Sequence, residues 1–138
     1  MKRLIFRTLE ALGAAVLLLA PAVYAQTLAD VPFDFQVGYD RMPAGEYLVQ
    51  PTQFGSPAIS ITNRQTRETK MVLTDTITAG NLSDTGKLVF NRYGDRYFLS
   101  QVWRAGFSTG CLLHKSKAER EIARASAGNA ALVAVKAR

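Results

Sequence analysis

Apolar and polar residues alternate with a period of two along much of the chain after residue 30. In the segment VPFDFQV, for example, single polar residues separate Phe33, Phe35 and Val37. This period is typical of a half-buried β-strand, because successive side chains of a strand point to opposite faces. Glycine-, proline- and asparagine-rich turn signals interrupt the pattern every 8 to 14 residues. We therefore expect strands at 31–37, 46–50, 57–62 and 69–76, with a short one at 111–113.

The segment 87–103 carries the strongest local pattern. Two strand-like runs flank Gly94-Asp95, a pair that suits a two-residue hairpin turn with glycine first. The resulting register pairs Phe90 with Leu99, Arg92 with Tyr97, and Leu88 with Gln101. One face of the hairpin then carries Leu88, Phe90, Tyr97, Leu99 and Trp103, and the other carries Val89, Phe98 and Val102. Apolar residues on both faces predict a central hairpin that is covered on both sides.

A helix is expected near the end of the chain. Ser116 and Glu119 stand three residues apart and form a capping box, in which each side chain accepts from a backbone N–H that would otherwise lack a partner. The helix should begin at Lys117 and end near Gly128-Asn129. Ile122 is its one large apolar residue, which predicts thin packing. Residues 130–135 could form a last strand.

These patterns predict a mainly β protein. We expect a small antiparallel β-sandwich or barrel of six to eight strands with one C-terminal helix, preceded by a helical signal peptide. The expected parts are the signal peptide at 1–25, a β domain at 26–114, and a basic helical tail at 115–138 with the possible last strand.

Residues 1–25 have the composition of a secretory signal. Three basic residues are followed by an apolar run of 13 residues from Ala11 to Val23, and a small residue stands at Ala25. We expect cleavage after Ala25 and export to the periplasm or beyond the cell. A membrane span needs about 20 apolar residues, and Pro21 ends this helix early, so no span is expected after cleavage.

The charge distribution and the cysteine content limit the partners and the disulfides that we expect. The expected β body is balanced, with eight basic and eight acidic residues in 26–113, whereas 114–138 holds six basic and two acidic ones. An electrostatic partner would therefore meet the tail. Export argues against a nucleic-acid partner. Cys111 is the single cysteine, so no internal disulfide forms, and its thiol is either buried or paired with a second chain.

Four segments resemble a family of small exported bacterial proteins that has no characterised activity. They are VPFDFQVG, MPAGEYLV, GKLVFNRYGDRYFLSQVW and KSKAEREIARA, and together they cover nearly all of the chain after the leader. The resemblance implies an exported β-rich domain with a basic C-terminal helix, and it implies no activity. Cys111-Leu112-Leu113-His114 stands where a more polar stretch is expected, which weakens a shared role for Cys111 or His114.

The residue types and their spacing give little support to a catalytic function. Cys111 and His114 form the one Cys/His combination, but residues three apart on an extended strand point to opposite faces. A transition-metal site needs three or four ligands, so we expect no metal and no cofactor. The sequence has no G-x-S-x-G, P-loop or dinucleotide motif. An enzyme that uses Cys111 is kept as the least favoured alternative.

Basic and aromatic residues interleave around the predicted hairpin. A ligand platform for sugars or other small molecules would use Arg92, Tyr97, Trp103 and Arg104. The competing interpretation makes Tyr97 and Trp103 core residues and leaves the arginines in solvent. Our leading hypothesis is a non-catalytic exported domain with a structural or interaction role in the cell envelope, its partner an envelope component or another protein. A small-molecule or glycan-binding module is the alternative.

Overall fold

The computed structural model describes residues 26–53, 56–82, 84–126 and 130–137. The expected signal peptide with its cleavage site at Ala25, and the expected end of the helix at Gly128-Asn129, lie outside the described residues. Within the described part, ten strands and one helix follow one another along the chain. They are β1 (Thr27–Val31), β2 (Phe35–Val37), β3 (Asp40–Met42), β4 (Gly45–Pro51), β5 (Ala58–Asn63), β6 (Thr69–Thr78), β7 (Lys87–Tyr93), β8 (Arg96–Trp103), β9 (Thr109–Leu113), α1 (Lys117–Ala125) and β10 (Ala130–Lys136).

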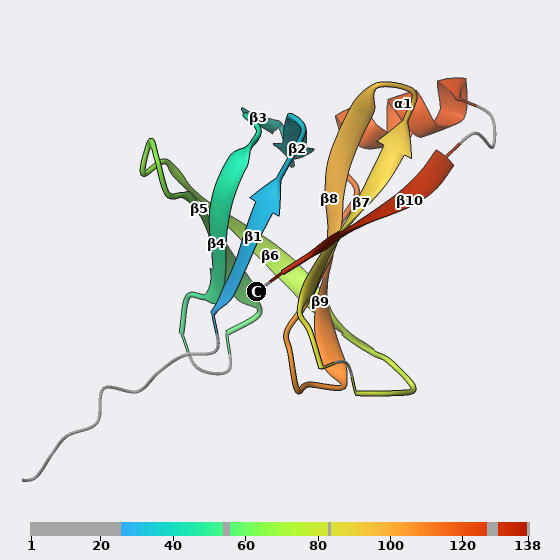
Figure 1. Cartoon of the computed structure of the whole chain (residues 1–138). Helices are drawn as coiled ribbons and strands as arrows, with labels where there is room; N and C mark the ends of the chain where they lie inside the picture. Colours follow the sequence, from blue (N-terminus) through green and yellow to red (C-terminus); the bar gives the residue numbers. More distant parts are fainter. Residues whose placement is uncertain (1–25, 54–55, 83, 127–129, 138) are drawn as a thin grey trace, which may run out of the picture.

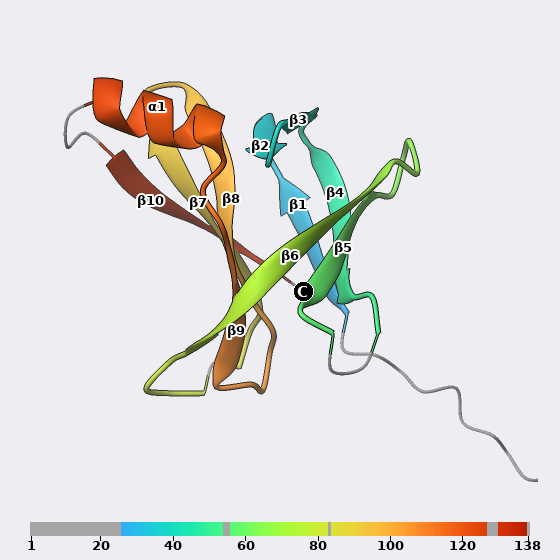
Figure 2. The ribbon, with the colours of Figure 1, turned by 180° about the vertical axis from the view of Figure 1, so that it is seen from behind.

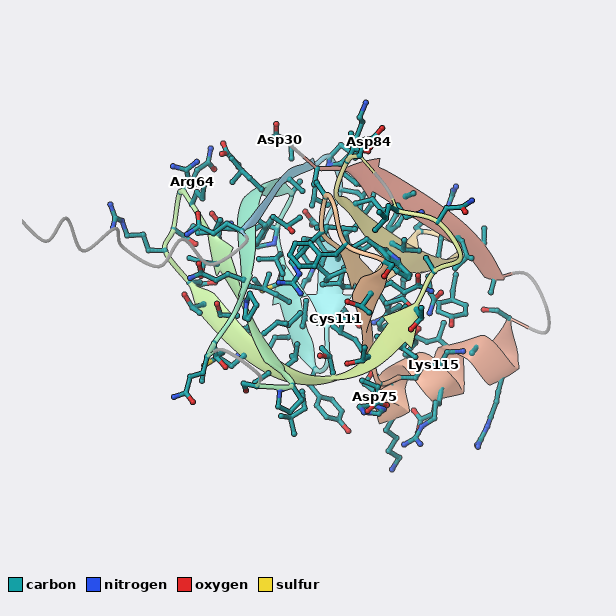
Figure 3. The ribbon with its side chains drawn as sticks, turned by 90° about the horizontal axis from the view of Figure 1, so that it is seen from below. Asp30, Arg64, Asp75, Asp84, Cys111 and Lys115 are labelled. Carbon is teal, nitrogen blue, oxygen red and sulfur yellow. The ribbon has the colours of Figure 1, made fainter. Side chains whose placement is uncertain are left out.

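Eight of these strands follow one another around a barrel, in the order β1-β4-β5-β6-β9-β8-β7-β10 (Figures 1 and 3). The long strand β6 joins the two halves, because its first half pairs with β5 and its second half with β9 (Figure 2). An isolated bridge between Ala29 and Ala137 brings β1 next to the end of β10. The mainly β class with one C-terminal helix is confirmed, although the strands number ten among the described residues rather than six to eight.

Part of the larger strand number comes from the segment 31–37, which was expected as one strand. The structure ends β1 at Val31 and begins β2 at Phe35. Pro32 stands at the break and has no N–H to donate to a ladder, which explains why pairing stops there. Phe33, between the two strands, packs against the core instead. β2 and β3 form a short hairpin, and β2 touches β8 in parallel at Gln36 and Phe98.

Aromatic and branched side chains fill the barrel. Phe35 lies between Tyr47 and Phe90, with ring centroids 4.9 and 5.2 Å away and edge-to-face geometry. The buried phenol of Tyr47 donates to the Pro43 carbonyl and accepts from Asn63 Nδ2 at 3.1 Å. This buried hydroxyl therefore has partners, as a polar group in a core requires.

The hairpin β7–β8 has the expected turn but a shifted register. Gly94 has a φ of +62°, which a glycine at the first turn position adopts without strain. Phe90 pairs with Leu99 and Arg92 with Tyr97, as predicted. The prediction that Leu88 lies opposite Gln101 is wrong, because Leu88 pairs with Val102.

A β-bulge at Ser100 causes this shift. Phe90 pairs with Leu99 and the next β7 residue, Val89, pairs with Gln101, so Ser100 is the extra residue of β8. One extra residue exchanges the two faces of the strand beyond it. Val102 consequently joins the core cluster, and the predicted common face of Tyr97 and Trp103 is wrong.

The helix α1 begins as predicted, and one half of the capping box is present. The Ser116 hydroxyl accepts from the Glu119 N–H at 3.1 Å. The Glu119 carboxylate does not contribute the other half: it is 4% exposed and accepts from Asn91 Nδ2 at 2.8 Å and from the Tyr93 hydroxyl at 3.2 Å. This contact anchors the helix to β7. The last segment of the chain joins the sheet, since β10 pairs with β7 along its whole length.

Candidate functional site

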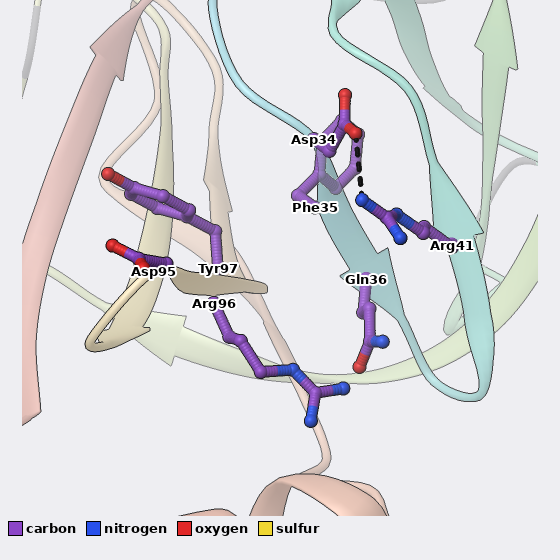
Figure 4. Close-up of a pocket in the computed structure, with 7 residues that line it drawn as sticks. All are labelled: Asp34, Phe35, Gln36, Arg41, Asp95, Arg96 and Tyr97. Atoms are coloured by element: carbon purple, nitrogen blue, oxygen red, sulfur yellow. Dashed lines mark hydrogen bonds and ion pairs between the residues drawn. The ribbon is translucent and has the colours of Figure 1, made fainter.

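A polar cleft of about 300 Å³ lies where the β2–β3 hairpin meets the tip of the β7–β8 hairpin (Figure 4). β2 and β8 pair only at Gln36 and Phe98 within the described residues, so the two hairpins separate on either side of that contact. The cleft is lined by Asp34, Phe35, Gln36, Arg41, Asp95, Arg96 and Tyr97. Most of these groups are polar or charged.

Asp34 is held by two donors. Its Oδ2 lies 3.0 Å from Arg41 Nη2, and its Oδ1 accepts from the Ala44 N–H at 2.9 Å. The backbone N–H and the guanidinium hold the pKa of Asp34 below its usual value. The carboxyl is therefore a fixed acceptor that orients Arg41, and it is poorly suited to donate a proton to a substrate.

Two arginine side chains of the cleft lining lie on either side of Gln36 (Figure 4). Arg96 reaches toward Gln36, and Arg41 lies on the other side of Gln36 (Figure 4). Within the described part of the chain, no carboxylate lies within ion-pair distance of Arg96, whose guanidinium carbon is 5.6 Å from the Phe98 ring centroid. Asp95 and Tyr97 point away from these groups. This side of the cleft is therefore suited to a ligand that supplies acceptor oxygens.

The structure places two of the four predicted platform residues opposite each other near the tip of the β7–β8 hairpin. Tyr97 lines the edge of the cleft, and its ring is stacked on Phe33 with centroids 3.8 Å apart. The Arg92 guanidinium carbon is 5.6 Å from the same ring centroid, and Arg92 Nε donates to the Gly94 carbonyl. Tyr97 and Arg92 thus engage groups of the chain itself, and one ring face of Tyr97 is already covered.

The other two platform residues lie elsewhere. Trp103 is six residues from Tyr97, about 20 Å along the strand, and the bulge turns it to the opposite face. Its indole N–H donates to Gln101 Oε1 at 2.9 Å, and its ring packs closely over Gly110. Arg104 stacks on Phe107 at 4.4 Å. The four residues therefore do not form one surface.

Sequence reasoning did not single out Asp34, Gln36, Arg41 or Arg96 as a site. The signal for Asp34 and Gln36 was present, because both occupy the polar positions of the alternating segment 31–37. Arg96 belonged to the basic and aromatic run around the hairpin. The local sequence pattern gives no sign of the parallel contact between β2 and β8. This contact brings Asp34 and Gln36 next to Arg96, about 60 residues further along the chain.

Cys111 and His114 are not brought together as a catalytic pair. Cys111 is half-buried on β9 and lines a small cavity of about 10 Å³ with Thr27 and Arg104. His114 is exposed, and its Nε2 lies 3.3 Å from Asp75 Oδ2. Among the residues that the structure describes, no group of three or more His, Cys, Asp or Glu side chains is arranged to hold a metal ion.

Two further findings concern membrane-spanning helices and similarity to known proteins. In the described ranges, no helix has the length and apolar character needed to cross a membrane. Comparison with known proteins found no family model, no curated protein and no solved structure that matches the chain.

Proposed function

We propose that this chain is a non-catalytic exported domain with an interaction role in the cell envelope, and that the polar cleft is its recognition site. The composition of residues 1–25 supports export. The chemistry of the cleft supports binding rather than catalysis: Asp34 is fixed by Arg41 and the Ala44 N–H, and the cleft lining contains no nucleophile with an adjacent base.

The ligand that fits this cleft best carries a carboxylate. Arg96 offers a planar guanidinium that has no carboxylate within ion-pair distance among the described residues, and the Arg41 guanidinium lies on the other side of Gln36 (Figure 4). Guanidinium and carboxylate groups match in shape and charge, and their hydrogen bonds are stronger than neutral ones. This donor arrangement is the single observation that carries the proposal.

The cleft volume limits the part of the ligand that it can enclose. About 300 Å³ lies at the lower end of the range for small-molecule sites. An acidic sugar ring or a group of similar size fits that volume. A neutral glycan receives less support, because it depends on an exposed aromatic face and Phe33 already covers one face of Tyr97. An enzyme that uses Cys111 also receives less support, because Cys111 lines a small cavity with Thr27 and Arg104, whereas His114 is exposed beside Asp75.

Nuclear magnetic resonance titration tests the proposal. The full-length chain, expressed with its leader and isotope-labelled, is titrated with glucuronate and with glucose, which differ in a carboxylate. We expect glucuronate to shift the amide signals of residues 34–36, 41 and 95–97, and glucose to shift them less. Arg96→Gln should weaken glucuronate binding about tenfold, since a charge-assisted bond contributes roughly 1.5 kcal/mol or more.

Arg120→Gln is the matched control, because it removes the same charge from an exposed position of α1. It should leave glucuronate binding unchanged. Signals that shift mainly along α1, or an Arg96→Gln protein that binds glucuronate as well as the parent, would contradict the proposed site.

A further inference from the structure

Four basic side chains just before and along α1 are exposed, namely Lys115, Lys117, Arg120 and Arg124. Among the described residues, none of the four lies within ion-pair distance of a carboxylate. Glu121 is the one exposed acidic residue between positions 115 and 126, since Glu119 is buried against β7. This segment therefore carries an excess of positive charge that the described part of the chain does not neutralise.

The charged side of α1 faces away from the barrel. Since successive residues of an α-helix lie about 100° apart around its axis, Lys117, Arg120 and Arg124 share one side. Glu119, which anchors the helix to β7, lies on the opposite side. Ile122, the one large apolar residue of α1, is half-buried on this anchored side. The outer side of α1 thus offers cations but no large apolar side chain with which to enter a bilayer.

Arg96 connects this charged segment with the polar cleft. It lines the cleft, and in the β7–β8 hairpin it pairs with Tyr93, whose hydroxyl donates to Glu119 of α1 at 3.2 Å. In both views of the fold, α1 lies beside the tip of this hairpin (Figures 1 and 2). The cleft and the cations of α1 therefore lie at the same end of the barrel, with Arg96 between them.

We propose that the cleft and α1 together bind a chain of acidic sugars, a polyuronate, with one carboxylate at Arg96 and further carboxylates along α1. This inference rests on the proposed function of the cleft. The cleft of about 300 Å³ has room for one sugar ring, so a longer ligand must continue outside it. Lys117 and Arg124 are about 10 Å apart along the helix axis, and a ligand with repeated carboxylates can reach both. A ligand with a single negative charge would leave these cations unused.

The contribution of α1 comes from the covalent link between the sugars. Once one carboxylate lies in the cleft, the next ones are held near α1 at a high effective concentration. Each exposed ion pair strengthens binding by up to about fivefold, so Lys117 and Arg124 together should contribute about tenfold. Because both side chains are exposed, this contribution should decrease as the salt concentration rises.

Calorimetric titration of the full-length chain with galacturonate and with a galacturonate hexamer tests this inference. Lys117→Gln combined with Arg124→Gln should weaken hexamer binding about tenfold relative to galacturonate binding. Lys87→Gln combined with Lys136→Gln is the matched control, because it removes the same charge from exposed positions at the other end of β7 and β10. The control protein should bind both ligands as the parent does. Hexamer binding that is as strong in the α1 variant as in the parent, or that is weakened equally in the control, would overturn the proposal.

Amide signals in nuclear magnetic resonance separate a failure of this inference from a failure of the cleft proposal. The hexamer should shift signals of residues 95–97 and 115–124 together, whereas galacturonate should shift only those of the cleft. Cleft shifts with both ligands but none along α1 would refute the inference and leave the cleft proposal standing. An absence of cleft shifts with either ligand would refute both. Hexamer shifts confined to α1 would assign this segment to polyanions in general and refute the shared site.

Discussion

Replacing Glu119 with alanine should destabilise the protein strongly, although the residue lies on a short helix at the surface of the barrel. Its carboxylate is 4% exposed and accepts from Asn91 Nδ2 and from the Tyr93 hydroxyl. The substitution leaves both donors without their acceptor. It also releases α1 from the sheet, because this contact anchors the helix to β7.

The magnitude follows from the two hydrogen bonds. Each bond to a charged group contributes about 1.5–3 kcal/mol, and part of the loss is offset because a carboxylate no longer has to be desolvated. We expect a loss of about 3 kcal/mol in the free energy of unfolding. For a domain of this size, that corresponds to a fall in Tm of roughly 12 °C.

Urea unfolding followed by circular dichroism and by Trp103 fluorescence measures this loss. Glu119→Gln keeps one acceptor oxygen and should cost about 1 kcal/mol. Glu121→Ala is the control, since Glu121 is exposed on the same helix and should change stability by less than about 0.5 kcal/mol. If Glu119→Ala costs no more than Glu121→Ala, the buried contact does not hold the helix and the reasoning fails.

Three further predictions concern Gly110, the bulge at Ser100 and the buried Tyr93. Gly110→Ala places a Cβ 2.7 Å from the Trp103 ring, so it should change Trp103 fluorescence and cost about 1–3 kcal/mol, whereas Gly80→Ala, with open space around it, should do neither. Deleting Ser100 removes the bulge but leaves Val102 opposite Leu88 and on the core face, so the purified chain should keep a cooperative unfolding transition in urea. Burial, reinforced by the Glu119 charge, raises the pKa of Tyr93 above its usual 10.0. The stability that Tyr93 contributes is therefore complete below pH 10 and lost as pH rises through its folded pKa, and Tyr93→Phe should lessen that alkaline loss.

The fold class was readable from the sequence because its signals are local. The alternation at Phe33 to Val37, the turn at Gly94-Asp95 and the Ser116 cap each depend on neighbouring residues. The structure bears out the strand character, the turn and the helix start. The extent of 31–37 differed because Pro32 interrupts a ladder that the period alone does not detect.

The candidate site was harder to predict from the sequence, because it depends on contacts between segments far apart in the chain and on one extra residue in β8. The alternation of apolar and polar residues does not reveal the bulge at Ser100. Because of this extra residue, Trp103 and Tyr97 point to opposite faces of β8. The parallel contact of Gln36 with Phe98 joins segments far apart in the chain. Glu119 reads as a capping residue from its spacing, and only the packing of α1 on β7 gives its carboxylate other partners.

A crystal structure of the chain with bound glucuronate tests the central claim most directly. We predict the carboxylate within hydrogen-bond distance of the Arg96 guanidinium in the cleft, with Asp34 still paired to Arg41. Glucuronate bound outside the cleft, or a cleft in which Arg96 pairs with Asp95 and excludes the carboxylate, would contradict it.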